Sequence, residues 1–481
     1  MSLIRELSSA ASYEIPAYQE GSDVKAAGLS VADHYLTRMG PFRYRIRSYL
    51  LPIVRAETPY LAALQQKFRN NALDMYFVYS ANLGTHTAFL VGLPLIFWFG
   101  SYSIANGLVD VLAAGVFFSG FMKDYFCLPR PLSPPLHRIT MSGSAALEYG
   151  FPSSHSTNAC SIAFYAFALL QSYQGSPVTK FVYQVLAAFY VFSIVFGRLY
   201  CGMHGFLDVI VGSLLGFGIG WARWSCTDMI ESYISNASAM SSFILILLII
   251  CMVRLHPEPA DSCPCFDDGV AFAGVVIGQY FSFWRFSHEI HNGPQFVPLH
   301  PGHFTIDTSD MHALGYFARV VLGVGMIIMW RAVTKPILHS CLPPLFRALE
   351  PIGVLIPRKG FASALLYSTV PKDLPDEVLP SIKEIPSMVR NFRRPRTDSV
   401  GPQSAADVYE AVAYKNRQRR LSNQTYNDAE RTEDSDSMKK LIEKPRVRYD
   451  VEVVTKLVVY SGVGWIAIDL VPRACLLVFG K

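Results

Sequence analysis

The run Phe243-Ile-Leu-Ile-Leu-Leu-Ile-Ile250 contains no polar side chain and is the purest apolar stretch of the chain. It belongs to an apolar segment over 240–255. Comparable segments recur near residues 76–100, 103–122, 158–173, 181–199, 206–224, 266–284, 312–333 and 455–479. A membrane-spanning helix needs about 20 apolar residues, so several segments must extend into their flanks. The pattern predicts an all-α polytopic membrane protein with about eight or nine transmembrane helices.

The composition agrees with this fold class. Charged residues make up 16% of the 481 residues, compared with about 25% in typical soluble proteins. The mean hydropathy is +0.27. Too few charges are present to cover a soluble surface of this size, which argues against an ordinary cytosolic enzyme and against a disordered protein. The net charge of +5 is too small to indicate a nucleic acid as partner.

The apolar segments also divide the chain into regions. We expect a polar and partly amphipathic N-terminal region, a catalytic membrane core, additional transmembrane helices, a basic and partly disordered loop, and a C-terminal transmembrane helix. Their bounds are 1–75, 76–224, 225–333, 334–450 and 451–481. The last helix is the least regular because it contains Asp469, Pro472 and Arg473. The first residues lack the apolar core of a cleavable signal peptide.

Two groups of residues suggest a metal, but neither does so strongly. Cys263 and Cys265 form a C-P-C pair with no second ligand pair nearby in sequence, a weak indication of zinc. The stretch 285–312 is rich in histidine and aspartate, yet its spacing does not repeat as ligand pairs do. It contains His288, His291, His300, His303, Asp307, Asp310 and His312. We interpret it as a polar loop and expect no metal at the active site.

Polar groups beside membrane spans are costly and usually functional, and the first two such clusters flank the second and third spans. Lys123-Asp-Tyr-Phe-Cys-Leu-Pro-Arg130-Pro131 follows the second span. Alone it could be a snorkelling flank. Gly150-Phe-Pro-Ser153-Ser154-His155-Ser156 precedes the third span. Alone it could be a helix cap with a stray histidine, but a helix N-terminus with hydroxyl groups also suits an anion.

The third cluster, Gly197-Arg198-Leu-Tyr-Cys-Gly-Met-His204-Gly-Phe-Leu-Asp208, joins the fourth span to the fifth. His204 and Asp208 are spaced i and i+4, so both can lie on one helix face. A carboxylate bonded to one imidazole nitrogen leaves the other free to attack. Counting crossings places all three clusters on one side of the membrane. Three cations, two histidines, a carboxylate and a helix N-terminus then suit binding and attack of a phosphoryl group.

These motifs resemble the three-part signature of the type 2 phosphatidic acid phosphatase (PAP2) superfamily. The pattern is Lys-x6-Arg-Pro, Pro-Ser-x-His and Arg-x5-His-x3-Asp. The chain matches it at Lys123, Arg130, Pro131, Pro152, Ser153, His155, Arg198, His204 and Asp208. Many members have Gly where this chain has Ser154, and Ser where it has Gly197. Neither difference removes a catalytic group. The resemblance covers about 76–224 and implies a PAP2-type helical core.

A narrower resemblance rests on Phe151-Pro-Ser-Ser-His-Ser-Thr-Asn158, on Gly197 to His204, on the spans after 240 and on Tyr449-Asp-Val-Glu452. These features are similar to those of the sphingosine-1-phosphate phosphatases, most of all the fungal long-chain-base phosphate phosphatases. The resemblance implies a multi-pass enzyme of the endoplasmic reticulum. Its implied substrates are sphingoid base phosphates such as dihydrosphingosine 1-phosphate and phytosphingosine 1-phosphate.

The resemblance also implies residue roles. His204 is the nucleophile that forms a phosphohistidine, Asp208 orients it, and His155 serves as general acid and base. The phosphoryl oxygens are held by Lys123, Arg130, Ser153, Ser154 and Arg198. No cofactor and no metal is implied, because cationic side chains fill that role. We therefore expect activity to survive EDTA.

Other functions remain open at this point. A lipid phosphotransferase would pass the phosphoryl group to an alcohol. A broader lipid phosphate or isoprenoid diphosphate phosphatase would differ in substrate only. A vanadium haloperoxidase uses a similar site but resembles soluble proteins. A catalytically silent scaffold or transporter would not need the motif residues.

Two indications of membrane orientation disagree. The basic tails share a face with the active site in the crossing count, and the positive-inside rule would make that face cytosolic. The family resemblance instead favours an active site at the luminal face. Two glycosylation sequons, at Asn236 and Asn423, fall on opposite faces in this count and can decide between the two.

Overall fold

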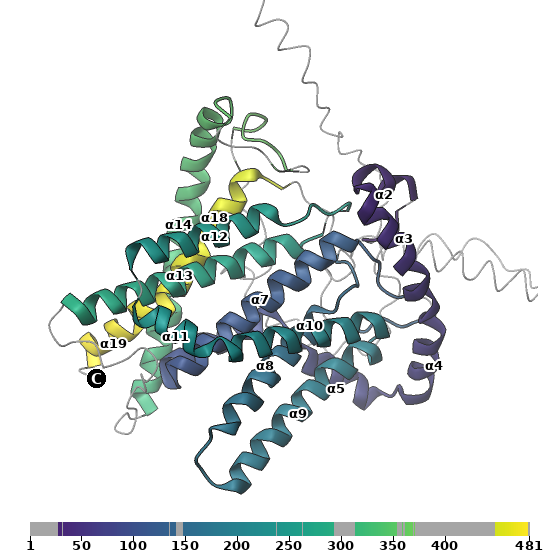
Figure 1. Ribbon diagram of the computed structural model, residues 1–481, viewed down its shortest axis with the longest axis horizontal. Coiled ribbons are helices and arrows are strands. Elements are labelled where there is room, and N and C mark those ends of the chain that lie inside the picture. Colours follow the sequence, from purple (N-terminus) through teal and green to yellow (C-terminus); the bar gives the residue numbers. More distant parts are fainter. Residues whose placement is uncertain are drawn as a thin grey trace, which may run out of the picture.

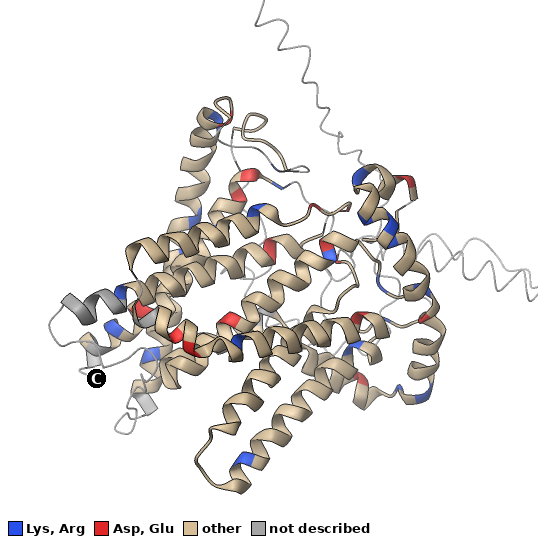
Figure 2. Ribbon diagram, viewed as in Figure 1, with Lys and Arg blue, Asp and Glu red and all other residues tan. Residues whose placement is uncertain are grey.

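The computed structural model describes residues 27–30, 32–133, 135–140, 148–236, 238–261, 263–292, 313–353, 358, 361–368, 370 and 448–479. Within these ranges all the regular elements are helices (Figure 1). Figure 2 shows that the long helices carry few charged residues along their length. This arrangement agrees with the predicted all-α class.

The core of the molecule is α7 (Tyr102–Phe126), against which α8 (Ser154–Gln171), α10 (Phe206–Ser225) and α13 (Cys265–Asn292) pack. Helix α9 (Pro177–Tyr200) lies along α8 (Figure 1). Close packing of α10 on α8 depends on Gly216, since a Cβ at that position would lie 2.1 Å from the carbonyl oxygen of Thr157. Small residues permit such approach between helices in a membrane, where burial of apolar surface gives little driving force.

The C-terminal half adds α12 (Ala239–Leu255), α14 (Ala313–Leu349), α18 (Asp450–Trp465) and α19 (Val471–Phe479). Helix α13 packs on both α7 and α18 and so joins the two halves. Its contact with α18 is also backbone to backbone, because a Cβ at Gly278 would lie 2.1 Å from the carbonyl oxygen of Ser461. Helix α18 therefore lies between α13 and α14 in this half (Figure 1).

The N-terminal region forms a chain of short helices along one end of the molecule (Figure 1): α2 (Ala32–Arg38), α3 (Pro41–Ala56), α4 (Thr58–Phe68) and α5 (Asn71–Ala81). A span over 76–100 was expected, but α5 ends at Ala81 and α6 (His86–Phe99) begins after a 3₁₀ turn at Asn82–Gly84. The reason is a local cap. The Thr85 side chain accepts a hydrogen bond from the backbone N–H of Ala88, which starts a new helix.

By length and composition, five of the described helices could cross a membrane: Tyr102–Phe126, Pro177–Tyr200, Phe206–Ser225, Gly315–Leu349 and Asp450–Cys475. The chain is thus a membrane protein with several spans, while the predicted eight or nine are not reached among the described helices. Helices α8 and α13 lie at predicted spans but fall outside this group. Helix α8 begins with the polar residues Ser154-His-Ser156, and α13 carries Asp267 and Asp268 in its first turn and Gln279 and Arg285 further along.

Candidate active site

Residues of all three motifs meet at one end of α7, α8 and α10. The Lys123 ammonium group lies 3.3 Å from the Ser154 hydroxyl oxygen, which joins the first motif to the second. Arg130 Nη1 lies 3.2 Å from Nε2 of His204, which joins the first motif to the third. All but Ser154 of these side chains are buried. The structure thus brings the three motifs together, as expected from the count of membrane crossings.

The end of α7 turns the chain so that Arg130 faces back into the molecule. Cys127 follows the helix in the left-handed conformation with φ 52°, and its N–H donates to the carbonyl of Lys123. Arg130 then donates from Nη1 to the carbonyl of Met203, at 2.9 Å. Lys123 and Arg130 therefore approach the same point from a helix and from the loop after it.

The two serines of the second motif have different surroundings. Ser153 is the N-cap of α8, and its hydroxyl oxygen accepts from the backbone N–H and the hydroxyl of Ser156. Its own N–H donates to the carbonyl of Asp208, which fastens α8 to α10. Ser154 instead turns its hydroxyl toward Lys123. Of the two hydroxyl groups, the one of Ser154 faces the cations.

His204 lies in the turn before α10, which begins at Phe206, and not on the helix face that the i, i+4 spacing suggested. Its Nδ1 is 2.8 Å from the carbonyl oxygen of Gly150 and 3.6 Å from Oδ2 of Asp208. Only the first distance is a hydrogen bond. A carbonyl can only accept, so Nδ1 carries the proton, and Arg130 can only donate, so Nε2 presents its lone pair. The tautomer is fixed by a backbone oxygen.

Asp208 is the third residue of α10, and its Oδ2 accepts from the backbone N–H of Gly205 at 2.8 Å. This bond closes the turn that holds His204. Its Oδ1 has no hydrogen-bond partner within the described part of the chain. Asp208 therefore shapes the His204 turn and places a carboxyl group beside Nδ1.

Arg198 and His155 complete the predicted set. Arg198 is buried near the end of α9, and its Nε has no hydrogen-bond partner among the described residues. His155 is half-buried at the start of α8, and a Cβ on Gly84 would lie 3.0 Å from its Cδ2. The close approach of that 3₁₀ turn holds the imidazole ring of His155 on one side.

Glu148 belongs to the site but was not found from the sequence. Its Oε2 lies 3.0 Å from the Lys123 ammonium and 3.2 Å from Nη2 of Arg130, and its side chain is 27% exposed. A carboxylate oxygen held by lysine and arginine is bound as a phosphoryl oxygen would be. The sequence gives no signal for this role, because Glu148 stands outside all three motifs.

Glu57 was also missed, and it comes from the turn between α3 and α4. Its Oε1 accepts from the backbone N–H of Leu207 at 2.9 Å, in the first turn of α10. A Cβ at Gly205 would lie 2.0 Å from Oε2, so glycine is needed there. Negative charge at a helix N-terminus is favourable. Burial raises the pKa of Glu57 above its ordinary value.

The electrostatics favour a neutral His204 imidazole. The pKa of His204 lies well below its ordinary value because burial disfavours the imidazolium, and the charges of Arg130, Lys123 and Arg198 add to this effect. Burial also lowers the pKa of Arg130, against the opposing charge of Glu148. The site thus holds an uncharged imidazole among cations.

Two further polar residues, Asp110 and Asn236, lie away from this site. Asp110 pairs with Arg223 at 2.8 Å in the membrane core. The histidine-rich stretch from His288 to His312 and the sequon at Asn423 lie outside the residues whose side chains the structure describes. Asn236 ends α11 (Thr227–Ser235), and its side chain donates to the carbonyl of Ser232.

Residues 104–232, which contain all three motifs, match the PAP2 superfamily, so the site is that of a PAP2-type phosphatase. The chain is 32% identical to a dihydrosphingosine 1-phosphate phosphatase of Schizosaccharomyces pombe, over 95% of this chain and 96% of that protein. It is also 32% identical to one of Saccharomyces cerevisiae, over 66% of this chain and 76% of that protein. The chain therefore belongs to the dihydrosphingosine 1-phosphate phosphatase family of the PAP2 superfamily.

A plant relative, lipid phosphate phosphatase delta of Arabidopsis thaliana, is 28% identical over 67% of this chain and 78% of that protein. No solved structure matches the chain. The family resemblance inferred from the three motifs is confirmed by these comparisons.

Proposed function

We propose that the protein hydrolyses sphingoid long-chain-base 1-phosphates, such as dihydrosphingosine 1-phosphate, through a phosphohistidine at His204. The observation that carries the proposal is the fixed tautomer of His204. Gly150 holds the proton on Nδ1, and the Nε2 lone pair faces Arg130, from which a phosphoryl oxygen would take over the contact. The named relatives act on dihydrosphingosine 1-phosphate.

In the first step, Nε2 of His204 attacks phosphorus and the bond from phosphorus to the lipid oxygen breaks. His155 protonates the leaving alkoxide, which departs as the free sphingoid base. The Nδ1 proton stays on His204, where the Gly150 carbonyl and the Asp208 carboxylate stabilise the positive charge of the phosphorylated ring.

In the second step, His155 accepts a proton from water, and the water oxygen attacks phosphorus. The bond between phosphorus and Nε2 breaks, which returns neutral His204 and inorganic phosphate. Lys123, Arg130 and Arg198 neutralise the equatorial oxygens in both steps, with the Ser154 hydroxyl and the backbone N–H groups at the start of α8. Ser153 acts through the cap that holds this turn.

Glu148 has to yield when substrate binds, because its carboxylate contacts the same two cations. It lies on the partly exposed side of the cluster and can turn outward. The lipid tail then extends from the site into the apolar membrane region.

We further propose, from the family resemblance, that the enzyme is a multi-pass protein of the endoplasmic reticulum with the active site at its luminal face. Glycosylation at Asn423 and not at Asn236 would support that orientation under the crossing count. Modification at Asn236 would contradict it.

The decisive experiment measures phosphate release by purified full-length protein in detergent with EDTA. Dihydrosphingosine 1-phosphate, phosphatidic acid and an isoprenyl diphosphate serve as substrates. We expect strong preference for the sphingoid phosphate. Equal release from all three would support the broader lipid phosphatase instead. Activity that is lost on chelation and restored by Mg²⁺ would contradict the mechanism. Transfer of phosphate to an added lipid alcohol at the expense of hydrolysis would support a phosphotransferase.

A further inference from the structure

A second buried cluster lies behind Lys123, at the contact between the two halves of the molecule. Asp124 comes from the last turn of α7, and Cys263 and Cys265 come from the start of α13. One carboxylate oxygen and the two sulfur atoms all lie within 4.8 Å of one another, and all three residues are buried. The approach is close because α7 carries Gly120, whose Cβ, if present, would lie 3.2 Å from the Cys265 carbonyl oxygen.

The carboxylate of Asp124 is buried beside the Cys263 thiol. Asp124 is 0% exposed, and neither of its side-chain oxygens has a hydrogen-bond partner within the described residues. A buried carboxylate without compensation costs several kcal/mol, so such groups are normally paired or bound to a metal. The nearest ring nitrogen, Nδ1 of His256, lies 3.7 Å from Oδ2 of Asp124, beyond hydrogen-bond distance.

The two cysteine sulfur atoms are 2.6 Å apart, and both cysteines are free. This separation is longer than the ~2.05 Å of a disulfide bond and shorter than the ~3.5 Å at which nonbonded heavy atoms rest. The Cys263 thiol donates a hydrogen bond to the Cys265 sulfur, so both sulfur atoms face the same point. Two thiolates and a carboxylate form a donor set that suits Zn²⁺.

We propose that Asp124, Cys263 and Cys265 bind one zinc ion whose fourth ligand is a water molecule. Each thiol loses its proton as its sulfur–zinc bond forms, so binding releases two protons and changes no oxidation state. In a tetrahedral site with bonds of about 2.3 Å the sulfur atoms move to about 3.8 Å apart. Rotation of the two side chains accommodates that change.

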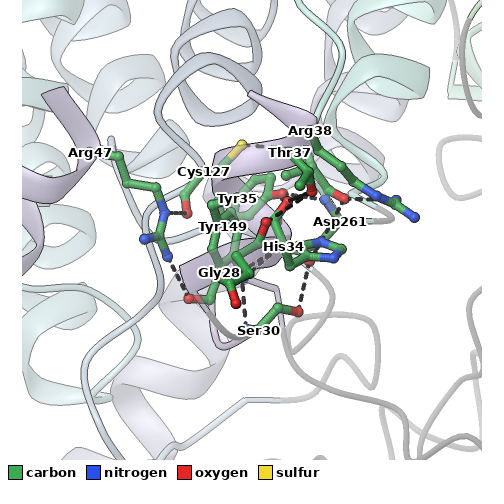
Figure 3. Close-up of polar contacts among 12 residues, drawn as sticks. Gly28, Ser30, His34, Tyr35, Thr37, Arg38, Arg47, Cys127, Tyr149 and Asp261 are labelled. Carbon is green, nitrogen blue, oxygen red and sulfur yellow. Dashed lines mark hydrogen bonds and ion pairs between the residues drawn. The ribbon is translucent and has the colours of Figure 1, made fainter. Parts of the chain in front are cut away.

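The loop that carries these ligands is held firmly on both sides. Arg358 donates to the carbonyl of His256 at 2.8 Å, and Arg448 donates to the carbonyl of Cys263. Asp261 is fastened by the N-terminal region, as Figure 3 shows. Its carboxylate accepts from the N–H of Gly28, from the hydroxyls of Ser30, Tyr35 and Tyr149, and pairs with His34. Ligands on such a supported loop lose little entropy when they bind a metal.

The ion would join the end of α7 to the start of α13. Lys123 is the neighbour of Asp124, so the bond to zinc also fixes the helix end that carries a phosphate-contacting side chain. Cys263 and Cys265 lie outside the region that matches the superfamily, 104–232. The proposed site is therefore an addition to the superfamily core, and its occupancy can be measured without reference to catalysis.

The test is elemental analysis of full-length protein purified in detergent from cells grown with added zinc. We expect about one zinc per chain, and near-complete loss in Cys263→Ser/Cys265→Ser and in Asp124→Asn. The double variant Cys251→Ser/Cys341→Ser is the matched control, because these two cysteines are exposed. It should keep its zinc. Size-exclusion chromatography shows whether each variant is folded.

A second measurement avoids the variants. Mercuribenzoate titration of the wild-type protein, read with a zinc dye, should release zinc as the buried thiols react. Wild-type protein that contains no zinc would overturn the proposal. So would a mass spectrum that shows a disulfide between Cys263 and Cys265. Because Mg²⁺ is a poor partner for thiolates, loss of this ion is distinguishable from a Mg²⁺-dependent reaction at His204.

Discussion

Two clusters of buried charge lie in the same helical core, and they differ in how their charges are balanced. In the first, Asp110 of α7 pairs with Nε of Arg223 at 2.8 Å and accepts from Gln279 of α13 at 2.7 Å. Arg223 also donates to Thr227. Each charged group contacts another member of this Asp110 cluster. We call the cluster closed because its charges are paired within it.

The cluster around His204 is open by comparison, because its positive charges outnumber the carboxylates that contact them. Lys123, Arg130 and Arg198 bring three positive charges, while Glu148 is the carboxylate that contacts the first two of them. Nε of Arg198 has no hydrogen-bond partner among the described residues. Excess positive charge in a buried place is costly unless an anion completes it. The comparison teaches that charge balance, rather than burial, separates a binding site from a structural contact in this membrane core.

The strongest test of the difference between the two clusters replaces His204, the proposed nucleophile. His204→Ala should lower kcat for dihydrosphingosine 1-phosphate by about 10⁴-fold or more, since no other group takes over attack. The thermal midpoint should change little, because no other side chain depends on this imidazole for a strong ion pair. Phosphate release and a thermal unfolding curve check both statements. His137→Ala is the matched control, as His137 is exposed, and it should stay active. Full activity in His204→Ala would contradict the assignment.

A smaller effect is expected at Asp208. In a catalytic triad, conversion of the aspartate to asparagine costs about 10⁴-fold because the histidine takes the wrong tautomer. Here the Gly150 carbonyl holds the Nδ1 proton and Asp208 stands 3.6 Å away. Asp208→Asn should therefore lower kcat only about 10- to 100-fold, since the loss is confined to stabilisation of the charged ring. A loss as large as that of a triad would show that Asp208, and not Gly150, sets the tautomer.

The next prediction concerns the carboxylate that contacts the cations. Glu148→Gln removes the charge that competes with phosphate for Lys123 and Arg130. Inhibition by inorganic phosphate should become about 3- to 10-fold stronger, in the range of an exposed charged contact. Steady-state kinetics with added phosphate measures this change. Asp228→Asn, on exposed α11, should have no effect. Weaker phosphate inhibition in Glu148→Gln would mean that Glu148 positions the cations instead of competing for them.

The sequence predicted the helical class because long apolar runs can be recognised directly. It also predicted that the three motifs meet, because an even number of membrane crossings returns the chain to the same face. Nothing in it predicted the Gly150 carbonyl, since a backbone acceptor has no signature in the residue type. Glu57 and Leu207 are 150 positions apart, and such pairs depend on packing. Asp124 likewise lies far from Cys263 and Cys265 in the sequence, and only the folded structure brings the three side chains together. The expected span over 76–100 is interrupted at Asn82–Gly84, because the Thr85 cap starts a new helix within the apolar stretch.

The smallest effect on kcat should come from a substitution in the closed Asp110 cluster. There the free energy of unfolding should change instead. Asp110→Asn keeps the shape of the side chain but leaves the charge of Arg223 unpaired in the core, at a cost of about 3 kcal/mol. Folded protein should keep kcat within about twofold, because the lost pair is structural and not part of the open cluster. Thermal unfolding in detergent, with kcat normalised to folded protein, separates the two quantities. Asp110→Asn/Arg223→Met should recover much of the stability, since removal of both charges ends the imbalance. A large loss of kcat with unchanged stability would mean that the closed cluster acts on the reaction, and the distinction between the two clusters would no longer hold.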